Sequence, residues 1–165
     1  AKFKDAYFQK YKNLWHHGDY AEVTKNRGFI IYGRSDATLN PGGVRLGTAE
    51  IYSVVDKFKE IKESIVVGQD WDNDIRIILF VVLIDKAKLD KILINRLKIQ
   101  IRKNASPRHV PSKIIVVTDI PRTKNGKIVE LSVKNAIDNR QIKNLEALAN
   151  PDVLEEYKNL TELSY

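Results

Sequence analysis

The apolar run at residues 75–84 constrains the fold of this chain more than any other stretch. It reads IRIILFVVLI and is hydrophobic throughout except for Arg76. A strand with one wet face alternates apolar and polar side chains, whereas a strand covered on both faces has no need to alternate. The run is also far shorter than the roughly 20 residues of a membrane-spanning helix. We therefore predict a strand that is packed on both sides.

The neighbouring segments supply the elements that would cover this strand. Apolar residues at helical spacing predict helices at 48–58, at 90–103 and from about residue 131. Apolar runs predict two further strands, at 61–67 and 113–117. The order predicts an α+β fold, in which a small three-stranded sheet has flanking helices and a β-hairpin and is followed by C-terminal helices.

Two turn signals mark the second half of the chain. The dipeptide Asn125-Gly126 lies between apolar residues and predicts a hairpin. The stretch from Asn150 to Asp152, with Pro151 between them, is typical of a helix start, with Asn150 as the capping residue.

The first 33 residues differ in composition from the rest of the chain. They are rich in aromatic residues and break at HHGDY and at NRG, which predicts a short helix followed by a hairpin. A piece of this size cannot bury a core of its own. We therefore interpret residues 1–33 as the remnant of a larger N-terminal domain. The polar string GRSDATLNPGG then marks the domain boundary, and the absence of methionine from the chain also suggests a fragment.

The charge of the chain favours a phosphorylated ligand. Its 28 lysines and arginines exceed its 21 acidic residues and give a net charge of +7. Nucleic-acid binders cluster basic residues and interleave aromatic ones, but here the basic residues are scattered among acids. We therefore expect neither nucleic acid nor a membrane as a partner. The absence of cysteine excludes disulfides and thiolate metal sites and is compatible with the cytoplasm.

Several short motifs could carry chemistry. In PRTKNGKIVE, Lys127 follows the turn and is either an ordinary surface lysine or a cation delivered to an active site. In GRSDATLNPGGVRLGTAEI, two arginines and a glycine pair precede a helix start, a combination that suits a phosphate. The residues concerned are Arg34, Asp36, Gly42, Gly43 and Arg45. Taken singly, each is equally typical of a glycine-rich surface turn.

Two weaker candidates lie outside these motifs. Asp19 follows a glycine in HHGDY and could accept the hydroxyls of a ribose, although a turn aspartate that bonds its own backbone is the simpler interpretation. Adjacent His16 and His17 do not have the spacing of metal ligands. Arg102 and Arg108 flank a proline-marked loop, together with Lys103, and could hold a phosphate or be plain surface.

Taken together, these strings resemble one family. WHHGDY, YGRSDATLNPGGVRLGTAEIY and SPRHVPSKIIVVTDIPRTKNGKIVE, in this order, are similar to the C-terminal third of the adenylate-forming acyl-CoA synthetases. The string GRSDATLNPGGVRLGTAEIY and the tail ALANPDVLEEY most resemble the branch that activates acetoacetate. The resemblance implies an acyl-adenylate made from ATP and a carboxylic acid, with Mg²⁺ bound to the ATP, followed by exchange of AMP for CoA.

The resemblance also implies a role for each motif residue. Lys127 would polarise the carboxylate and the α-phosphate during adenylation, and a regulatory acetyltransferase could remove its charge. Asp19, Arg34 and Arg45 would contact the nucleotide. Residues 34–36 would form a hinge centred on Asp36, and residues 37–165 a C-terminal lid domain that rotates against the missing N-terminal domain. The expected CoA contacts are Gly42, Gly43 and Arg102.

Four positions depart from the pattern of the family. Ala37 stands where relatives often carry an acid, and Arg122 and the pair Ile128-Val129 differ from the acetoacetate branch. Two alternatives therefore stay open. The chain could come from another short-chain enzyme, such as an acetyl-CoA synthetase. It could also be a stand-alone basic module that binds CoA, a nucleotide or RNA.

Overall fold

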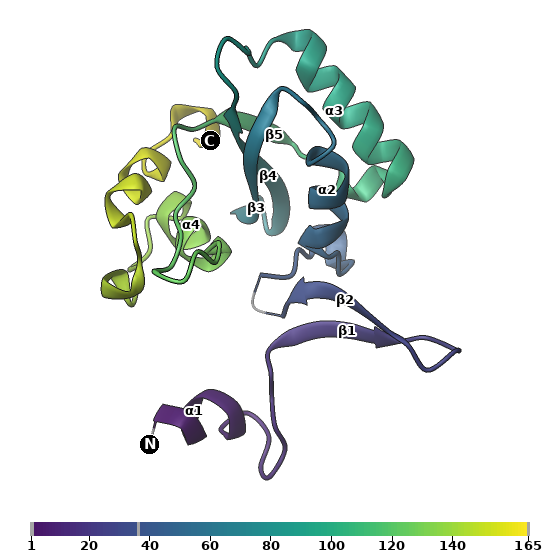
Figure 1. Ribbon diagram of the computed structural model, residues 1–165, viewed down its shortest axis with the longest axis vertical. Coiled ribbons are helices and arrows are strands. Elements are labelled where there is room, and N and C mark those ends of the chain that lie inside the picture. Colours follow the sequence, from purple (N-terminus) through teal and green to yellow (C-terminus); the bar gives the residue numbers. More distant parts are fainter. Residues whose placement is uncertain (1, 36, 165) are drawn as a thin grey trace.

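The computed structural model describes residues 2–35 and 37–164 (Figure 1). Its main sheet has three strands in the order β3-β4-β5, which places β4 at the centre. β3 (Ile61–Trp71) and β4 (Asp74–Leu83) pair antiparallel, and β5 (Lys113–Val116) joins β4 in parallel. The predicted three-stranded sheet and the α+β class are confirmed. β3 runs four residues beyond the predicted strand, because Asp72 and Asn73 both adopt positive φ and close a two-residue hairpin.

The central strand is covered on both faces, as its composition predicts. Alternate residues of β4 enter two separate cores, with Phe80 in one and Leu79 in the other. The Phe80 core is closed by α4 (Glu130–Ile137) and by the turns that follow it. The Leu79 core is closed by α2 (Thr48–Val55) and α3 (Lys91–Asn104). Figure 1 shows these two groups of helices on opposite sides of the sheet.

The N-terminal part consists of α1 (Lys2–Phe8) and a hairpin of β1 (Asp19–Val23) and β2 (Phe29–Arg34). The helix and the hairpin were both predicted, and both are confirmed. In Figure 1 they extend away from the three-stranded sheet. The hairpin leaves large apolar side chains in solvent, with Phe29 72% and Ile31 55% exposed. The hairpin meets the rest of the chain at Gly47, where an added Cβ would lie 2.4 Å from the carbonyl oxygen of Tyr32.

Two predictions about the C-terminal half are corrected. The chain after Asn150 forms a 3-10 segment, η4 (Pro151–Tyr157), instead of an α-helix, and the neighbouring η3 (Leu145–Ala147) and η5 (Thr161–Leu163) are also 3-10 turns. The Asn150 side chain makes no capping hydrogen bond. The hairpin predicted at Asn125-Gly126 is a tight turn closed by the bridge between Arg122 and Ile128. The described residues on either side of this turn do not form a pair of strands.

Short turns connect the remaining elements. η1 (Pro41–Gly43) precedes α2, and η2 (Pro107–His109) connects α3 to β5. None of the helices in the described part of the chain is both long and apolar enough to span a membrane.

We predict that Phe80→Ala destabilises the chain by about 3–5 kcal/mol, because Phe80 is fully buried and a cavity would remain. Its ring packs edge-on against that of Tyr157, with 4.9 Å between the centroids. Urea unfolding monitored by circular dichroism measures the change. The control is Ile99→Ala on the exposed side of α3, where Ile99 is 52% exposed and the change should stay within about 0.5 kcal/mol. Equal losses for both variants would contradict the two-sided core.

Candidate functional site

The structure brings Asp19 and Arg34 together at the open end of the N-terminal hairpin. The two residues are cross-strand partners, at the first position of β1 and the last position of β2. The Arg34 guanidinium lies over Gly18, within 3.3 Å of the position that a Cβ would occupy there, and donates a 3.5 Å hydrogen bond to the carbonyl of His17. The hairpin therefore places one cation and one carboxylate side by side.

The Asp19 carboxylate has a partner that the sequence did not suggest. Its Oδ2 atom lies 2.5 Å from Nδ1 of His17, and the His17 side chain is 68% exposed. The structure gives the adjacent histidines separate surroundings, because the ring of His16 lies edge-on to Tyr11. A hydroxyl-bearing ligand at Asp19 would therefore meet His17 as well.

The glycine pair lies in a loop that is held by one carboxylate. We call residues 39–46 the glycine loop, and a backbone bridge between Leu39 and Leu46 closes it. Both carboxylate oxygens of Asp74 accept from the Gly42 amide, at 2.8 and 2.9 Å. Hydrogen bonds from the backbone amides of Ile75 and Gly42 lower the pKa of Asp74. The carboxylate thus stays charged and keeps the loop in place across the neutral range.

The two glycines of this loop meet the same backbone requirement but have different surroundings. Both have positive φ, +58° at Gly42 and +74° at Gly43, where a side chain would strain the backbone. Apart from Gly43 and its two chain neighbours, no described residue has an atom within 4 Å of the position of a Cβ on Gly43, so the backbone there faces open space. A ligand can therefore approach the main chain at Gly43.

The proline-marked loop after α3 folds onto the glycine loop. Ser106 accepts a 3.2 Å hydrogen bond from the Arg108 amide at the start of η2. The buried His109 side chain is fixed between Ser106 Oγ and Glu50 Oε2, each at 2.8 Å. As a result, Arg108 Nη1 lies 3.5 Å from the position that a Cβ would take on Gly42. Arg108, which the sequence left as phosphate contact or plain surface, is thus next to the glycine pair.

Lys127 lies in a stiff turn with its side chain in solvent. Thr123 closes the turn twice, because its amide donates to the Lys127 carbonyl at 2.9 Å and its hydroxyl accepts from the Lys127 amide at 3.1 Å. Gly126 takes the positive φ of +76° that the turn requires. The backbone of Lys127 is therefore fixed while its ammonium group is exposed.

The remaining predicted residues are distributed over the surface. Arg45 is exposed at the end of the glycine loop, and Arg102 is exposed in the last turn of α3. Asp36, the predicted hinge centre, lies outside the described residues. In the described part of the chain, no hydrogen bond or ion pair joins Lys127 to Asp19, Arg34 or Arg102.

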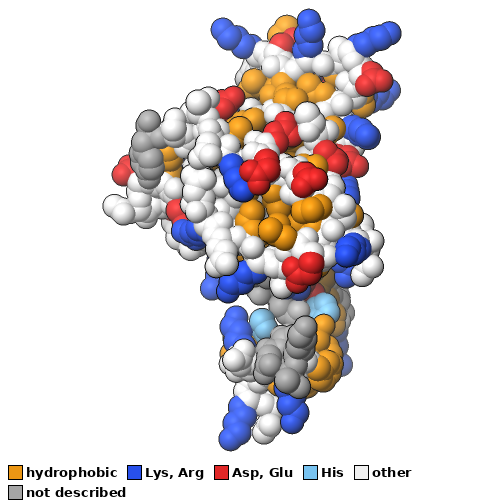
Figure 2. Space-filling view, turned by 90° about the vertical axis from the view of Figure 1, so that its left-hand side faces the viewer, with side chains coloured by type: hydrophobic (Ala, Val, Ile, Leu, Met, Phe, Trp, Pro, Cys, Tyr) orange, Lys and Arg blue, Asp and Glu red, His pale blue; other side chains and the backbone are white. Residues whose placement is uncertain are grey.

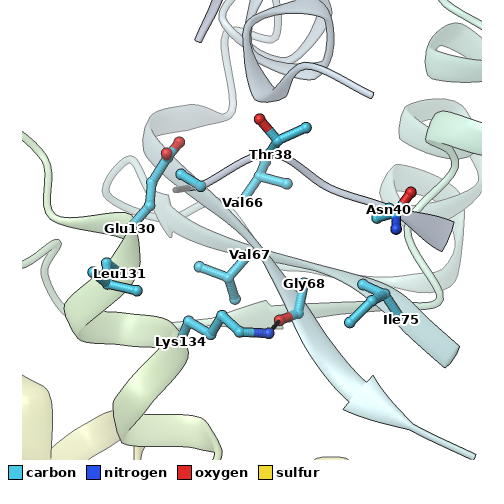
Figure 3. A pocket seen from close by; sticks show the side chains of 10 residues that line it. Thr38, Asn40, Val66, Val67, Gly68, Ile75, Glu130, Leu131 and Lys134 are labelled. Carbon is cyan, nitrogen blue, oxygen red and sulfur yellow. Dashed lines mark hydrogen bonds between the residues drawn. The ribbon is translucent and has the colours of Figure 1, made fainter. Parts of the chain in front are cut away.

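A pocket of about 200 Å³ lies between β3, the segment 37–40 and α4 (Figure 3). Its polar rim is already paired. Lys134 Nζ donates to the carbonyl of Gly68 at 2.8 Å and to Asp70 at 2.9 Å, and Glu130 accepts from the Tyr52 hydroxyl at 2.5 Å. Burial, together with the charge of Glu130, raises the pKa of Tyr52 well above its ordinary value. This pocket therefore reads as a mainly apolar recess next to the predicted hinge.

Charge on the outer face of α4 and the C-terminal turns is mixed. Figure 2 shows separate hydrophobic patches on this face, with acidic and basic side chains interspersed around them. The basic side chains visible there do not gather into one stripe. This face therefore lacks the continuous basic track that a nucleic-acid backbone would require.

Comparison with known proteins assigns the class. Residues 50–127 match the model of the family described as AMP-binding enzyme C-terminal domain. The matched segment begins at Glu50, inside α2, and ends at Lys127 in the lysine turn, so this part of the chain is similar to the C-terminal domain of AMP-binding enzymes.

Individual relatives point to one kind of enzyme. Over 99% of its length the chain is 55% identical to the acetoacetyl-coenzyme A synthetase of Rhizobium meliloti (strain 1021) and 44% identical to that of Xenopus tropicalis. The structure of the acetoacetyl-CoA synthetase from Streptomyces lividans superposes with a TM-score of 0.86 at 39% identity, over 95% of this chain and 24% of that one. The chain spans about a quarter of the length of these relatives.

We predict that the bond between Asp74 and the Gly42 amide persists to unusually low pH. Because the pKa of Asp74 lies below its ordinary value of about 4, the bond is present above that value and is lost as the pH falls through the lowered one. The chemical shift of the Gly42 amide proton, followed by NMR, should therefore change only below about pH 4. In the control variant Asp74→Asn that step should vanish. A step at or above the ordinary pKa would contradict the contact.

Proposed function

We propose that this chain is the C-terminal part of an ATP-dependent acid–CoA ligase that acts on acetoacetate. The observation that carries the proposal is the 55% identity, over 99% of the chain, to the acetoacetyl-coenzyme A synthetase of Rhizobium meliloti. In the first half-reaction a carboxylate oxygen attacks the α-phosphorus of ATP and pyrophosphate leaves. In the second, the CoA thiol attacks the acyl carbon, and AMP leaves with the bonding electron pair.

Lys127 is the proposed catalytic residue of the first half-reaction. The attacking carboxylate is brought against the negatively charged α-phosphate as the bond forms, and a preplaced cation stabilises the negative charge that is crowded there. A fixed backbone with an exposed ammonium group supports this role, because the lysine can reach a site on another domain without reordering its own turn. Acetylation of Lys127 would remove the charge, so we also propose this lysine as a target of a regulatory acetyltransferase.

Asp19, Arg34 and Arg45 are the proposed nucleotide contacts. Asp19 would accept the ribose hydroxyls, and Arg34, its cross-strand partner, would contact the same nucleotide. Arg45 would reach a phosphate from the end of the glycine loop. Mg²⁺ would arrive with ATP: in residues 2–35 and 37–164, no group of three or more His, Asp or Glu side chains is arranged to hold a metal ion.

The glycine loop and the end of α3 are the proposed contacts for CoA. Open space at Gly43 suits the approach of a narrow ligand such as the pantetheine arm, with Gly42 held in place by Asp74. Arg102 would bind the 3′-phosphate of CoA from the last turn of α3. Its guanidinium is exposed, and no ion pair with a described residue engages it.

The proposed domain division follows from the exposed hairpin. Residues 1–33 would be the last part of the large N-terminal domain, whose remaining chain would cover Phe29 and Ile31. Residues 34–36 would be the hinge, centred on Asp36, and residues 37–165 the lid. Because the acyl pocket and the pyrophosphate site would lie in the large domain, the 165 residues alone should not form an acyl-adenylate.

We predict that Lys127→Ala in the intact ligase slows adenylation by about 10²–10³-fold, because one electrostatic contact to the transition state is lost. Thioester formation from a supplied acyl-adenylate should be largely spared, because rotation of the lid would by then have carried the lysine turn away from the reacting atoms. Pyrophosphate release measures the first step, and acetoacetyl-CoA formation measures the second.

The matched control is Lys124→Ala in the same turn, since Lys124 is equally exposed. Its side chain should matter little, because the contact it makes to Ala147 comes from its backbone amide. Normal adenylation by Lys127→Ala, or a parallel loss of both half-reactions, would remove the catalytic role.

We predict that Arg102→Ala raises the apparent KM for CoA and leaves the KM for dephospho-CoA nearly unchanged. A charge-assisted contact is worth about 1.5–3 kcal/mol, or roughly ten- to a hundredfold in affinity. Steady-state kinetics of the intact ligase with both thiols measures the difference. Lys91→Ala, at the opposite end of the same helix and also exposed, is the control and should change neither value much. An equal penalty for both thiols would show that Arg102 does not recognise the 3′-phosphate.

A further inference from the structure

The turn that carries Lys127 is fastened to a segment that lies beyond α4. We call residues 145–163, from η3 to η5, the C-terminal segment. Its backbone pairs with the turn through a bridge between Thr123 and Leu148. Two hydrogen bonds extend the pairing, from the Lys124 amide to the Ala147 carbonyl at 3.0 Å and from the Ala149 amide to the Arg122 carbonyl at 2.8 Å. One side of the turn is therefore paired residue by residue with this segment.

Asn150 ties the base of the turn with its side chain. Its Oδ1 accepts from the amide of Arg122 at 2.8 Å. Its Nδ2 donates to Asp119 Oδ2 at 2.7 Å and to the carbonyl of Ile120 at 3.1 Å. The side-chain amide of Asn150 thus connects Asp119 and Ile120, just before the turn, with Arg122, the first residue of the turn. Each of these hydrogen bonds joins residues about 30 positions apart in the sequence.

The other side of the turn is fixed to the sheet through Arg122. Its guanidinium forms an ion pair with Glu63 of β3 at 3.0 Å and donates to the carbonyl of Gly126 at 3.1 Å. Because Asn150 holds the backbone of Arg122 and Glu63 holds its side chain, the residue is fixed at both ends. Gly126, next to Lys127, is bound to the same guanidinium.

The C-terminal segment is also anchored to the core and to the sheet. Tyr157 is fully buried, packs on Phe80 and donates to the carbonyl of Asp119 at 2.8 Å. At its far end, the carbonyl of Leu163 accepts from Gln69 and Arg76, at 3.2 and 2.8 Å. Asn150 can therefore act as a fixed point, because the segment around it is also held by the buried Tyr157 and by Gln69 and Arg76 of the sheet.

We propose that Asn150 is a positioning residue for adenylation, which holds the lysine turn in register so that Lys127 reaches the reacting carboxylate. The proposal rests on the proposed function of Lys127. The ammonium group of a lysine lies at the end of four methylenes and can adopt many positions. If the backbone of the turn also moves, the ammonium group spends a smaller fraction of the time at the reacting atoms. A misplacement of about 1 Å remote from the chemistry can cost on the order of 10² in rate.

The test compares Asn150→Ala and Asn150→Asp in the intact ligase. Alanine removes all three hydrogen bonds. Aspartate keeps the size and an acceptor for Arg122 but loses both donors and places a second carboxylate against Asp119. We expect both variants to slow adenylation by about 10–10²-fold, measured as acetoacetate-dependent pyrophosphate release, and to leave thioester formation from supplied acyl-adenylate within about twofold.

Hydrogen–deuterium exchange separates positioning from general damage. Amides of peptides covering residues 119–130 should exchange faster in both variants, while those of β4 stay protected. The control variant is Glu155→Gln, in the same segment, whose exposed side chain pairs with Lys158 and with no other described residue. It should change neither the exchange of the turn nor either half-reaction.

The possible outcomes distinguish a failure of the positioning role of Asn150 from a failure of the catalytic role of Lys127. If Lys127→Ala slows adenylation while Asn150→Ala and Asn150→Asp remain normal, the positioning role is wrong and the proposed function stands. If Lys127→Ala itself adenylates normally, both are wrong. Equal loss of the two half-reactions in the Asn150 variants, or faster exchange throughout β4, would show that Asn150 only supports the fold.

Discussion

The two-sided burial of β4 is the constraint on which the rest of this structure depends. Consecutive residues of the strand enter different cores, and Leu79 and Phe80 are both fully buried. A shift of one residue in register would exchange the two sets of side chains. The register is therefore fixed from both faces at once, and so are the loops at the ends of the strands. Asp74 at the start of β4 and the turn after β5 inherit their positions from this core.

The loops that carry the candidate residues share one device, a side-chain acceptor bonded to a backbone amide. Asp74 holds Gly42 in this way, Ser106 holds Arg108, and Asn150 holds Arg122. Amides in irregular backbone lack a partner in a helix or sheet, and a nearby polar side chain supplies one. The result is a set of loops whose backbones are fixed while cationic side chains stay exposed. Such cations suit phosphate groups that arrive with a ligand.

The N-terminal hairpin differs from these loops, because its apolar side chains are exposed. Its register places Asp19 beside Arg34, but its apolar side chains, with Phe29 the most exposed, have no cover in the described part of the chain. Contiguous apolar surface of this kind marks a site of contact with other protein. The two halves of the proposed nucleotide site therefore differ in physical character. The half on the glycine loop is positioned by a buried core. The half on the hairpin lacks, in the described part of the chain, the surface that would complete it.

Local patterns in the sequence were sufficient for the three-stranded sheet, for α2 and α3 and for the turn of Lys127, but not for the C-terminal 3-10 segments. Unbroken apolarity marked the central strand, helical spacing marked α2 and α3, and Asn125-Gly126 marked the turn, because each signal is carried by neighbouring residues. Asn150 shows where such reasoning stops. An Asn before a proline is a good local cap, yet its side chain bonds to Asp119 and Arg122. Likewise, the packing of Arg108 against Gly42 joins residues far apart in sequence. Only the tertiary structure decides such contacts, because the free energy of a polar side chain depends on which partners the packed core brings within reach.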